Sequence, residues 1–175
     1  GAAALAAEYN GCAGASHIKD KLIEMTHLNE TLYCCGIACS AEGSPTASGS
    51  YMIDLLLANV CKQNVTRFPY EIVRLAEDIA GGLMVTAPSE ADFRDPKLGP
   101  VIKKYLKAAA GATAENRLRV FRLIKNLCLG TAAVGYRTES MHGAGSPQAQ
   151  RIMIARQGNL DHKKELAKSI AHIQE

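Results

Sequence analysis

Glu139 and His142 have the residue types and spacing that best fit proton-transfer chemistry. They lie three positions apart, and the neighbouring Gly143 and Gly145 remove side-chain bulk beside them. Because a loop without side chains lets a large ligand approach the backbone, a carboxylate and an imidazole there could exchange protons with a substrate. We expect both residues to sit in a glycine-rich bend. The alternative is structural: a helix ends, a loop follows, and a new helix starts at Ser146–Pro147.

The Gly81–Gly82 pair is a second candidate, because it follows a long apolar helical pattern. It is either a plain helix stop or a place where another backbone, or a flat cofactor, comes close. The two glycines alone do not decide between these interpretations.

Cys34, Cys35 and Cys39 suggest a metal site, since residues four apart on a helix share a face. Zinc and iron–sulfur sites usually need four ligands, however, and the sequence has no second pair at close spacing. Free cysteine is among the most buried residue types, so we predict that these three pack in the core and expect no metal ligand in the chain. The helical setting of the six cysteines predicts reduced thiols in a cytoplasmic protein.

Apolar residues recur at helical spacing along most of the chain, and sustained alternation typical of strands is absent from the sequence. This pattern predicts an all-α fold, an up-and-down helical bundle, in a single domain over residues 1–175. An ordered loop is expected over 87–100. The predicted helices cover 16–42, about 50–80 with a kink or restart at Pro69, 101–110, Thr113 to about Cys128, an apolar stretch after Gly130, and one or two helices after Pro147, the last over 161–174.

The composition is that of an ordinary globular protein, with 47% hydrophobic and 21% charged residues among 175. The net charge of +3 is too small and too scattered to indicate a nucleic-acid partner. No apolar run approaches the ~18 residues of a membrane span, so no membrane partner is expected. The Ala-rich opening lacks an N-cap and looks like the middle of a helix. We therefore expect the chain to be the carboxy-terminal part of a longer chain.

Three long segments resemble the carboxy-terminal part of the 4-hydroxybutyryl-CoA dehydratase/vinylacetyl-CoA Δ-isomerase family: 17–39, 54–90 and 135–157. The wider group includes flavin-dependent 4-hydroxyphenylacetate 3-monooxygenases. It is more distantly similar to acyl-CoA dehydrogenases, in which a run like Gln150–Arg156 follows the active-site loop. The resemblance implies a bundle like the acyl-CoA dehydrogenase carboxy-terminal domain.

The resemblance further implies a homotetrameric enzyme with FAD and a [4Fe-4S] cluster that converts 4-hydroxybutyryl-CoA to crotonyl-CoA and moves the double bond of vinylacetyl-CoA. In the family the cluster ligands belong to segments that precede this chain. We therefore expect the 175-residue chain alone to bind neither FAD nor iron stoichiometrically, to be inactive, and to self-associate through helix faces that normally pack on sister subunits.

Glu139 matches a family glutamate near the substrate, so the resemblance implies an acid/base or hydrogen-bonding role for it. His142 has only proximity to support it. Gly81 and Gly82 align with a Gly-Gly pair that approaches the flavin of a neighbouring subunit in acyl-CoA dehydrogenases, where a Gln often stands at the position of Asp78. Two alternatives stay open: the carboxy-terminal domain of a 4-hydroxyphenylacetate 3-monooxygenase-like enzyme, and a non-catalytic helical oligomerisation module.

Overall fold

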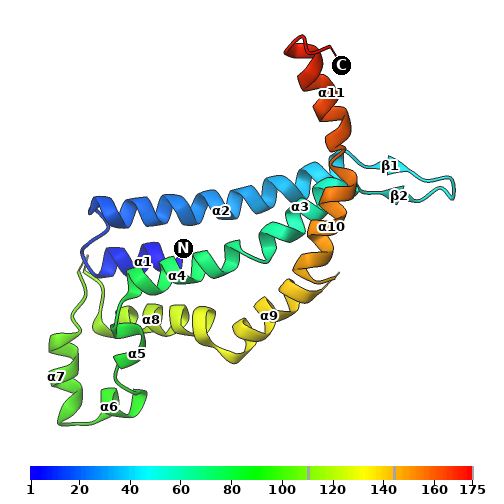
Figure 1. Cartoon of the computed structure of the whole chain (residues 1–175). Coiled ribbons are helices and arrows are strands. Elements are labelled where there is room, and N and C mark those ends of the chain that lie inside the picture. Colours follow the sequence, from blue (N-terminus) through cyan, green and yellow to red (C-terminus); the bar gives the residue numbers. More distant parts are fainter. Residues whose placement is uncertain (110, 144, 175) are drawn as a thin grey trace. The chain divides into compact units, whose positions relative to one another are not determined.

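The computed structural model describes residues 1–109, 111–143 and 145–174, and helices account for nearly all of its regular structure (Figure 1). A short antiparallel pair joins β1 (Ser44–Pro45) to β2 (Tyr51–Met52). The all-α prediction is confirmed. The helices are α1 (Ala2–Tyr9), α2 (Ser16–Ala41), α3 (Leu55–Val65), α4 (Phe68–Ala80), α5 (Leu83–Thr86), α6 (Glu90–Arg94), α7 (Leu98–Tyr105), α8 (Ala114–Leu129), α9 (Thr131–His142), α10 (Pro147–Gln157) and α11 (Leu160–Ile170).

Side-chain caps explain where several helices begin. The Thr113 hydroxyl accepts a hydrogen bond from the Asn116 amide at the start of α8, as the sequence predicts. Ser146 caps α10 in the same way and Pro147 takes its first position, which is also confirmed. Each cap satisfies an amide that has no partner inside its helix, so polar side chains fix the helix starts.

The predicted helix over 16–42 is confirmed by α2, and the predicted break near Pro69 is confirmed by the gap between α3 and α4. The predicted stop at the glycine pair is confirmed as well, because α4 ends at Ala80 and Gly81 has a φ of +65°. A left-handed residue after the last turn ends a helix, and glycine reaches that conformation without strain.

The expected loop over 87–100 is wrong, because α6 and the start of α7 lie within it. Ser89 and Asp92 form a reciprocal capping box that starts α6. The Asp95 carboxylate accepts from the amides of Lys97 and Leu98, and it starts α7 three residues before the predicted helix. That helix also ends earlier than the predicted 101–110, because α7 stops at Tyr105. Ala110 itself lies outside the described residues.

The last helix is shorter than the predicted 161–174. Helix α11 covers Leu160–Ile170, and His172 adopts a φ of +54°. A left-handed residue cannot continue a right-handed helix, so the helix stops before it.

The chain divides into two compact units, residues 1–29 with 68–138 and residues 30–67 with 139–175. They are called the core unit and the loop unit below. The single domain over 1–175 stays a prediction.

In the core unit, α1, α4 and α8 pack against one another around an apolar core. Phe121 is 0% exposed and Ile124 is 1% exposed on the buried side of α8. Small residues of α1, such as Ala6 and Ala7, let the neighbouring helices approach closely. A second, smaller cluster joins Phe93, on α6, to the start of α8.

In the loop unit, α3 packs along α10 (Figure 1). Three of its most buried residues carry polar or sulfur atoms, with exposed fractions of 9% for Cys39, 8% for Thr66 and 1% for Gln150. The unit is therefore held by polar contacts as well as by apolar packing. No helix within the described residues combines the length and the apolar character that a membrane span requires.

Candidate active site

Helix α9 carries the two candidate catalytic residues. It begins directly after α8, and Arg137 secures the junction by donating to the carbonyl oxygens of Leu127 at 3.3 Å and Cys128 at 2.6 Å. The Arg137 guanidinium also stacks over the Tyr70 ring, 5.7 Å from its centroid. These carbonyls have no partner within α8, so Arg137 caps the end of α8. The same contacts bind α9, which carries Arg137, to the end of α8.

The sequence predicts that Glu139 and His142 lie in a bend, and this prediction is wrong. Both residues lie in the last turn of α9. Helical hydrogen bonding continues to their end, since the Gly143 amide donates to the Glu139 carbonyl oxygen at 2.6 Å. Residues three apart on a helix share a face, so the structure places the two side chains on one side of α9. Both side chains are exposed.

The glycine-rich loop follows immediately and is fixed by a buried glutamine. Gly145 has a φ of +107°, which only glycine adopts without strain. The Gln150 side chain, 1% exposed, donates from Nε2 to the Gly145 carbonyl oxygen at 3.2 Å. A hydrogen bond from α10 therefore fixes the loop that follows Glu139 and His142.

Lys62 is a site residue that the sequence analysis missed. It extends from α3, and its ammonium donates to the carbonyl oxygen of Ser140, the residue next to Glu139. The signal was present in the run of polar residues at 62–64 within an apolar helical pattern. Pattern alone could not show which distant backbone atom this lysine meets.

The candidate flavin-contact residues Asp78, Gly81 and Gly82 lie together at the end of α4, in the core unit. Both glycines are exposed, and an added Cβ at either would meet no atom within 4 Å. The Asp78 carboxylate is paired with Lys21 at 2.6 Å. The hydrogen bond from Lys21 lowers the pKa of Asp78, so the carboxylate is ionised at neutral pH. The catalytic candidates belong to the other unit.

The cysteines divide by environment. Cys39 is buried, as predicted, but Cys34 is exposed, so core packing is wrong for Cys34. Cys35 is half-buried and accepts a weak hydrogen bond from Asn64. Burial, and then the neighbouring thiols of Cys35 and Cys39, raise the pKa of Cys61, which keeps this thiol protonated. Within the described ranges, no three His, Cys, Asp or Glu side chains group as a metal site would require.

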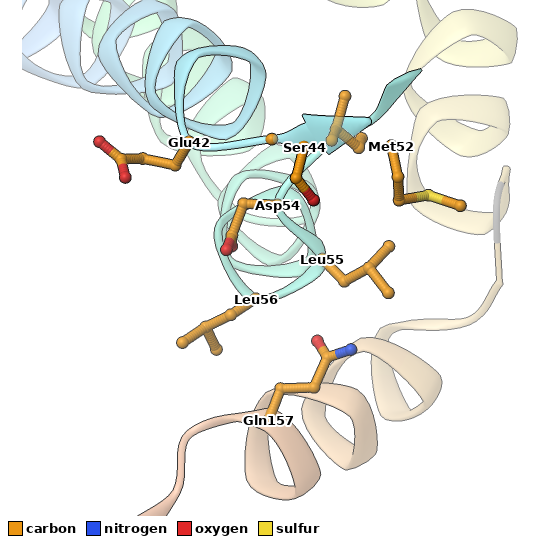
Figure 2. A pocket seen from close by; sticks show the side chains of 9 residues that line it. Glu42, Ser44, Met52, Asp54, Leu55, Leu56 and Gln157 are labelled. Atoms are coloured by element: carbon orange, nitrogen blue, oxygen red, sulfur yellow. The ribbon is translucent and has the colours of Figure 1, made fainter. Parts of the chain in front are cut away.

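A cavity of about 400 Å³ lies in the loop unit, where the β1–β2 hairpin meets the start of α3. Gln157 reaches from α10 toward the end of α3 that carries Leu55 and Leu56 (Figure 2). The Asp54 carboxylate lines the cavity but already caps α3 by accepting from the Leu57 amide at 2.7 Å. Neither Glu139 nor His142 lines it, so this cavity is separate from the candidate catalytic residues.

The described arrangement combines a helical bundle with a carboxylate at a helix end and a glycine-rich loop, and comparison with known proteins gives it a family. The chain belongs to the 4-hydroxyphenylacetate 3-hydroxylase C-terminal family, whose model matches residues 1–172. This confirms the wider group to which the sequence was assigned.

Among curated relatives, the chain is 73% identical over 181 residues to the 4-hydroxybutyryl-CoA dehydratase/vinylacetyl-CoA-Δ-isomerase of Clostridium aminobutyricum, a match covering 99% of this chain and 37% of the relative. It is 30% identical over 129 residues to the 4-hydroxyphenylacetate 3-monooxygenase oxygenase component of Thermus thermophilus, covering 74% of this chain and 26% of that protein. The chain thus spans little more than a third of the first relative's length and about a quarter of the second's.

Solved structures agree. An oxygen-tolerant archaeal 4-hydroxybutyryl-CoA dehydratase from N. maritimus matches with a TM-score of 0.92 and 63% identity, over 99% of this chain and 35% of that chain. The oxygenase component of 4-hydroxyphenylacetate 3-monooxygenase, in complex with FAD, matches with a TM-score of 0.86 and 25% identity, over 97% of this chain and 35% of that one. The resemblance stated from the sequence is confirmed.

Proposed function

We propose that this chain is the carboxy-terminal helical domain of an enzyme that dehydrates 4-hydroxybutyryl-CoA to crotonyl-CoA and isomerises vinylacetyl-CoA. The observation that carries the proposal is the 73% identity to the Clostridium aminobutyricum dehydratase/isomerase across 99% of the chain. Identity to the Thermus thermophilus monooxygenase component is 30% over a shorter stretch. The dehydratase is therefore favoured over a flavin-dependent aromatic hydroxylase and over a non-catalytic oligomerisation module.

Glu139 is proposed to hold or move a proton at the substrate. Its exposed carboxylate stands at the end of α9, where it could reach a reacting carbon or oxygen once the rest of the enzyme encloses the site. His142 lies on the same face of α9 and is proposed as a second hydrogen-bonding or proton-transfer group. The thioester end of an acyl-CoA is proposed to lie against this end of α9, beside the Glu139 carboxylate.

FAD fits the residues at the end of α4. The exposed backbone of Gly81 and Gly82 has no side chain in front of it, so a flat ring could lie against it. The ion pair with Lys21 holds Asp78 one turn before the glycines, where it could accept a hydrogen bond from the cofactor. Bound flavin would supply one-electron chemistry. The residues of this chain would supply contact and orientation.

A [4Fe-4S] cluster does not fit the described residues, because none of their His, Cys, Asp and Glu side chains group in threes as possible metal ligands. The cluster of the complete enzyme is proposed to be held by segments outside this chain. The 175-residue chain alone is accordingly proposed to retain neither FAD nor iron stoichiometrically.

Self-association and a cytoplasmic setting are also proposed. Helix α2 exposes large apolar side chains, with Ile23 66%, Tyr33 65% and Ile37 54% exposed. Exposed apolar side chains along a helix favour burial against another surface. The six free thiols fit a reducing compartment.

The test is an assay of the full-length enzyme that contains this chain. We expect conversion of 4-hydroxybutyryl-CoA to crotonyl-CoA under anaerobic conditions, and no hydroxylation of 4-hydroxyphenylacetate with reduced flavin and oxygen. Hydroxylation without dehydration would replace the proposal with the monooxygenase alternative. If protein that contains its cofactors shows neither activity, the result would favour the oligomerisation module.

A further inference from the structure

The position of Lys62 gives the loop unit a second functional element. Its half-buried ammonium donates to the Ser140 carbonyl oxygen, 78 residues away in sequence. An ideal Cβ built on Gly143 would stand 4.0 Å from Lys62 Nζ and 3.0 Å from the Glu139 carbonyl oxygen. The lysine head therefore lies against the turn that runs from Glu139 to Gly143.

A lysine is an unusual residue at a half-buried position against the end of a helix. Lysine is rarely buried, because its charged head loses hydration unless a partner replaces the water. The last carbonyls of a helix are suitable partners, since they lack amide donors and carry the negative end of the helix dipole. The ammonium thus holds the helix end that carries the candidate catalytic carboxylate.

We propose that Lys62 is a positioning residue for Glu139: by binding the end of α9, its ammonium fixes where the Glu139 carboxylate stands during proton transfer. The inference rests on the proposed function, because it assumes that Glu139 acts on the substrate. It assigns Lys62 no contact with the substrate.

The loop that follows this turn has a donor of its own. Gln150 binds the Gly145 carbonyl oxygen from α10, and α10 packs against the helix that carries Lys62. One helix end therefore meets a cationic donor from α3 and the succeeding loop meets an amide donor from α10. A catalytic group held by several such contacts stays close to its productive geometry.

The first experiment compares full-length enzymes carrying Lys62→Met, Lys62→Arg and the matched control Lys163→Met. Lys163 lies on α11 and is exposed. A displacement of about 1 Å at a catalytic group lowers the rate by up to about 10²-fold. We expect Lys62→Met to lower kcat by about 10-fold or more with little change in KM, Lys62→Arg to regain part of the loss, and the control to match wild type.

The second experiment separates positioning from general support with a double-mutant cycle. If Lys62 acts through Glu139, Lys62→Met lowers kcat far less in a Glu139→Gln background than in wild type. Full additivity, or a Lys62→Met kcat within about twofold of wild type, would overturn the proposal. If Lys62→Met does not fold, Lys62→Gln, which keeps a donor without charge, takes its place in the cycle.

Hydrogen exchange of the full-length protein gives a readout that does not depend on dehydratase activity. We expect the Gly143 amide, which donates to the Glu139 carbonyl oxygen, to exchange faster in Lys62→Met than in wild type or Lys163→Met. Unchanged exchange would contradict the positioning role. An enzyme that lacks dehydratase activity but shows the faster exchange would contradict the proposed function and leave the Lys62 contact standing.

Discussion

The core unit and the loop unit bury different kinds of residue. On α8 of the core unit, Phe121 and Ile124 are 0% and 1% exposed and pack within the apolar cluster of that unit. In the loop unit the most buried side chain is that of Gln150, also 1% exposed, and it binds a backbone carbonyl. Close packing of apolar side chains stabilises the core unit, whereas a directed hydrogen bond to the backbone stabilises the loop unit.

The difference separates two tasks. Apolar packing is tolerant of direction and contributes most of a domain's stability. Directed hydrogen bonds contribute less each, but they fix positions, which a site for proton transfer requires. Changes in the apolar core around α8 should therefore alter stability with little effect on chemistry, whereas a change of the Glu139 carboxylate should alter chemistry with little effect on stability.

The largest effect on stability is expected from Phe121→Ala in the core unit. Removing a fully buried ring leaves a cavity and lowers the free energy of unfolding by about 3–5 kcal/mol. Thermal unfolding of the full-length enzyme, followed by circular dichroism, measures the change. Leu123→Ala on the same helix, at a position 50% exposed, is the control and should shift the midpoint much less. Equal shifts would contradict the assignment of the core.

A smaller effect is expected from Gln150→Met in the loop unit. Methionine has a similar length but leaves the Gly145 carbonyl oxygen without this donor, which costs about 1–3 kcal/mol. Urea unfolding measures the loss, and Gln148→Met, at an exposed position of α10, is the control. If the loop unit depended on volume alone, as the core unit does, the two variants would be equally stable.

The smallest effect, and a test of the flavin contact, is expected at the glycine pair. Gly81→Ala forces a left-handed conformation on alanine and costs about 1–2 kcal/mol, whereas Gly82, with a φ of −58°, accepts alanine without strain. If flavin lies against this backbone, both variants should lose FAD from the full-length enzyme, measured by its absorbance. Normal FAD content in Gly82→Ala would reduce the pair to a helix stop.

Much of the fold could be predicted from local sequence. The Thr113 and Ser146 caps, the break at Pro69 and the stop at Gly81 follow from single residues with strong conformational preferences. The stretch over 87–100 was predicted wrongly because its prolines suggest a loop. There, Ser89 and Asp92 form the capping box of a short helix, which composition does not show.

The candidate site was only partly accessible from sequence. Glycine content placed Glu139 in a bend, but the helix continues until the glycines themselves, because its hydrogen bonds persist to Gly143. The partners Lys62 and Gln150 could not be found, since each reaches a backbone carbonyl through the packing of α3 and α10. Sequence period reveals which face is buried, not which distant carbonyl a polar side chain meets.

The central claim is that the end of α9 serves chemistry and not stability. Its most direct test is the turnover of full-length enzyme carrying Glu139→Gln, measured together with its thermal midpoint and its FAD and iron content. Glutamine keeps the shape but cannot exchange a proton, so we predict a fall in dehydration of about 10²-fold or more, with an unchanged midpoint. Glu139→Asp, which withdraws the carboxylate by one methylene, should also fall. Near-normal turnover of Glu139→Gln, with cofactors intact, would contradict the account and return the end of α9 to a structural role.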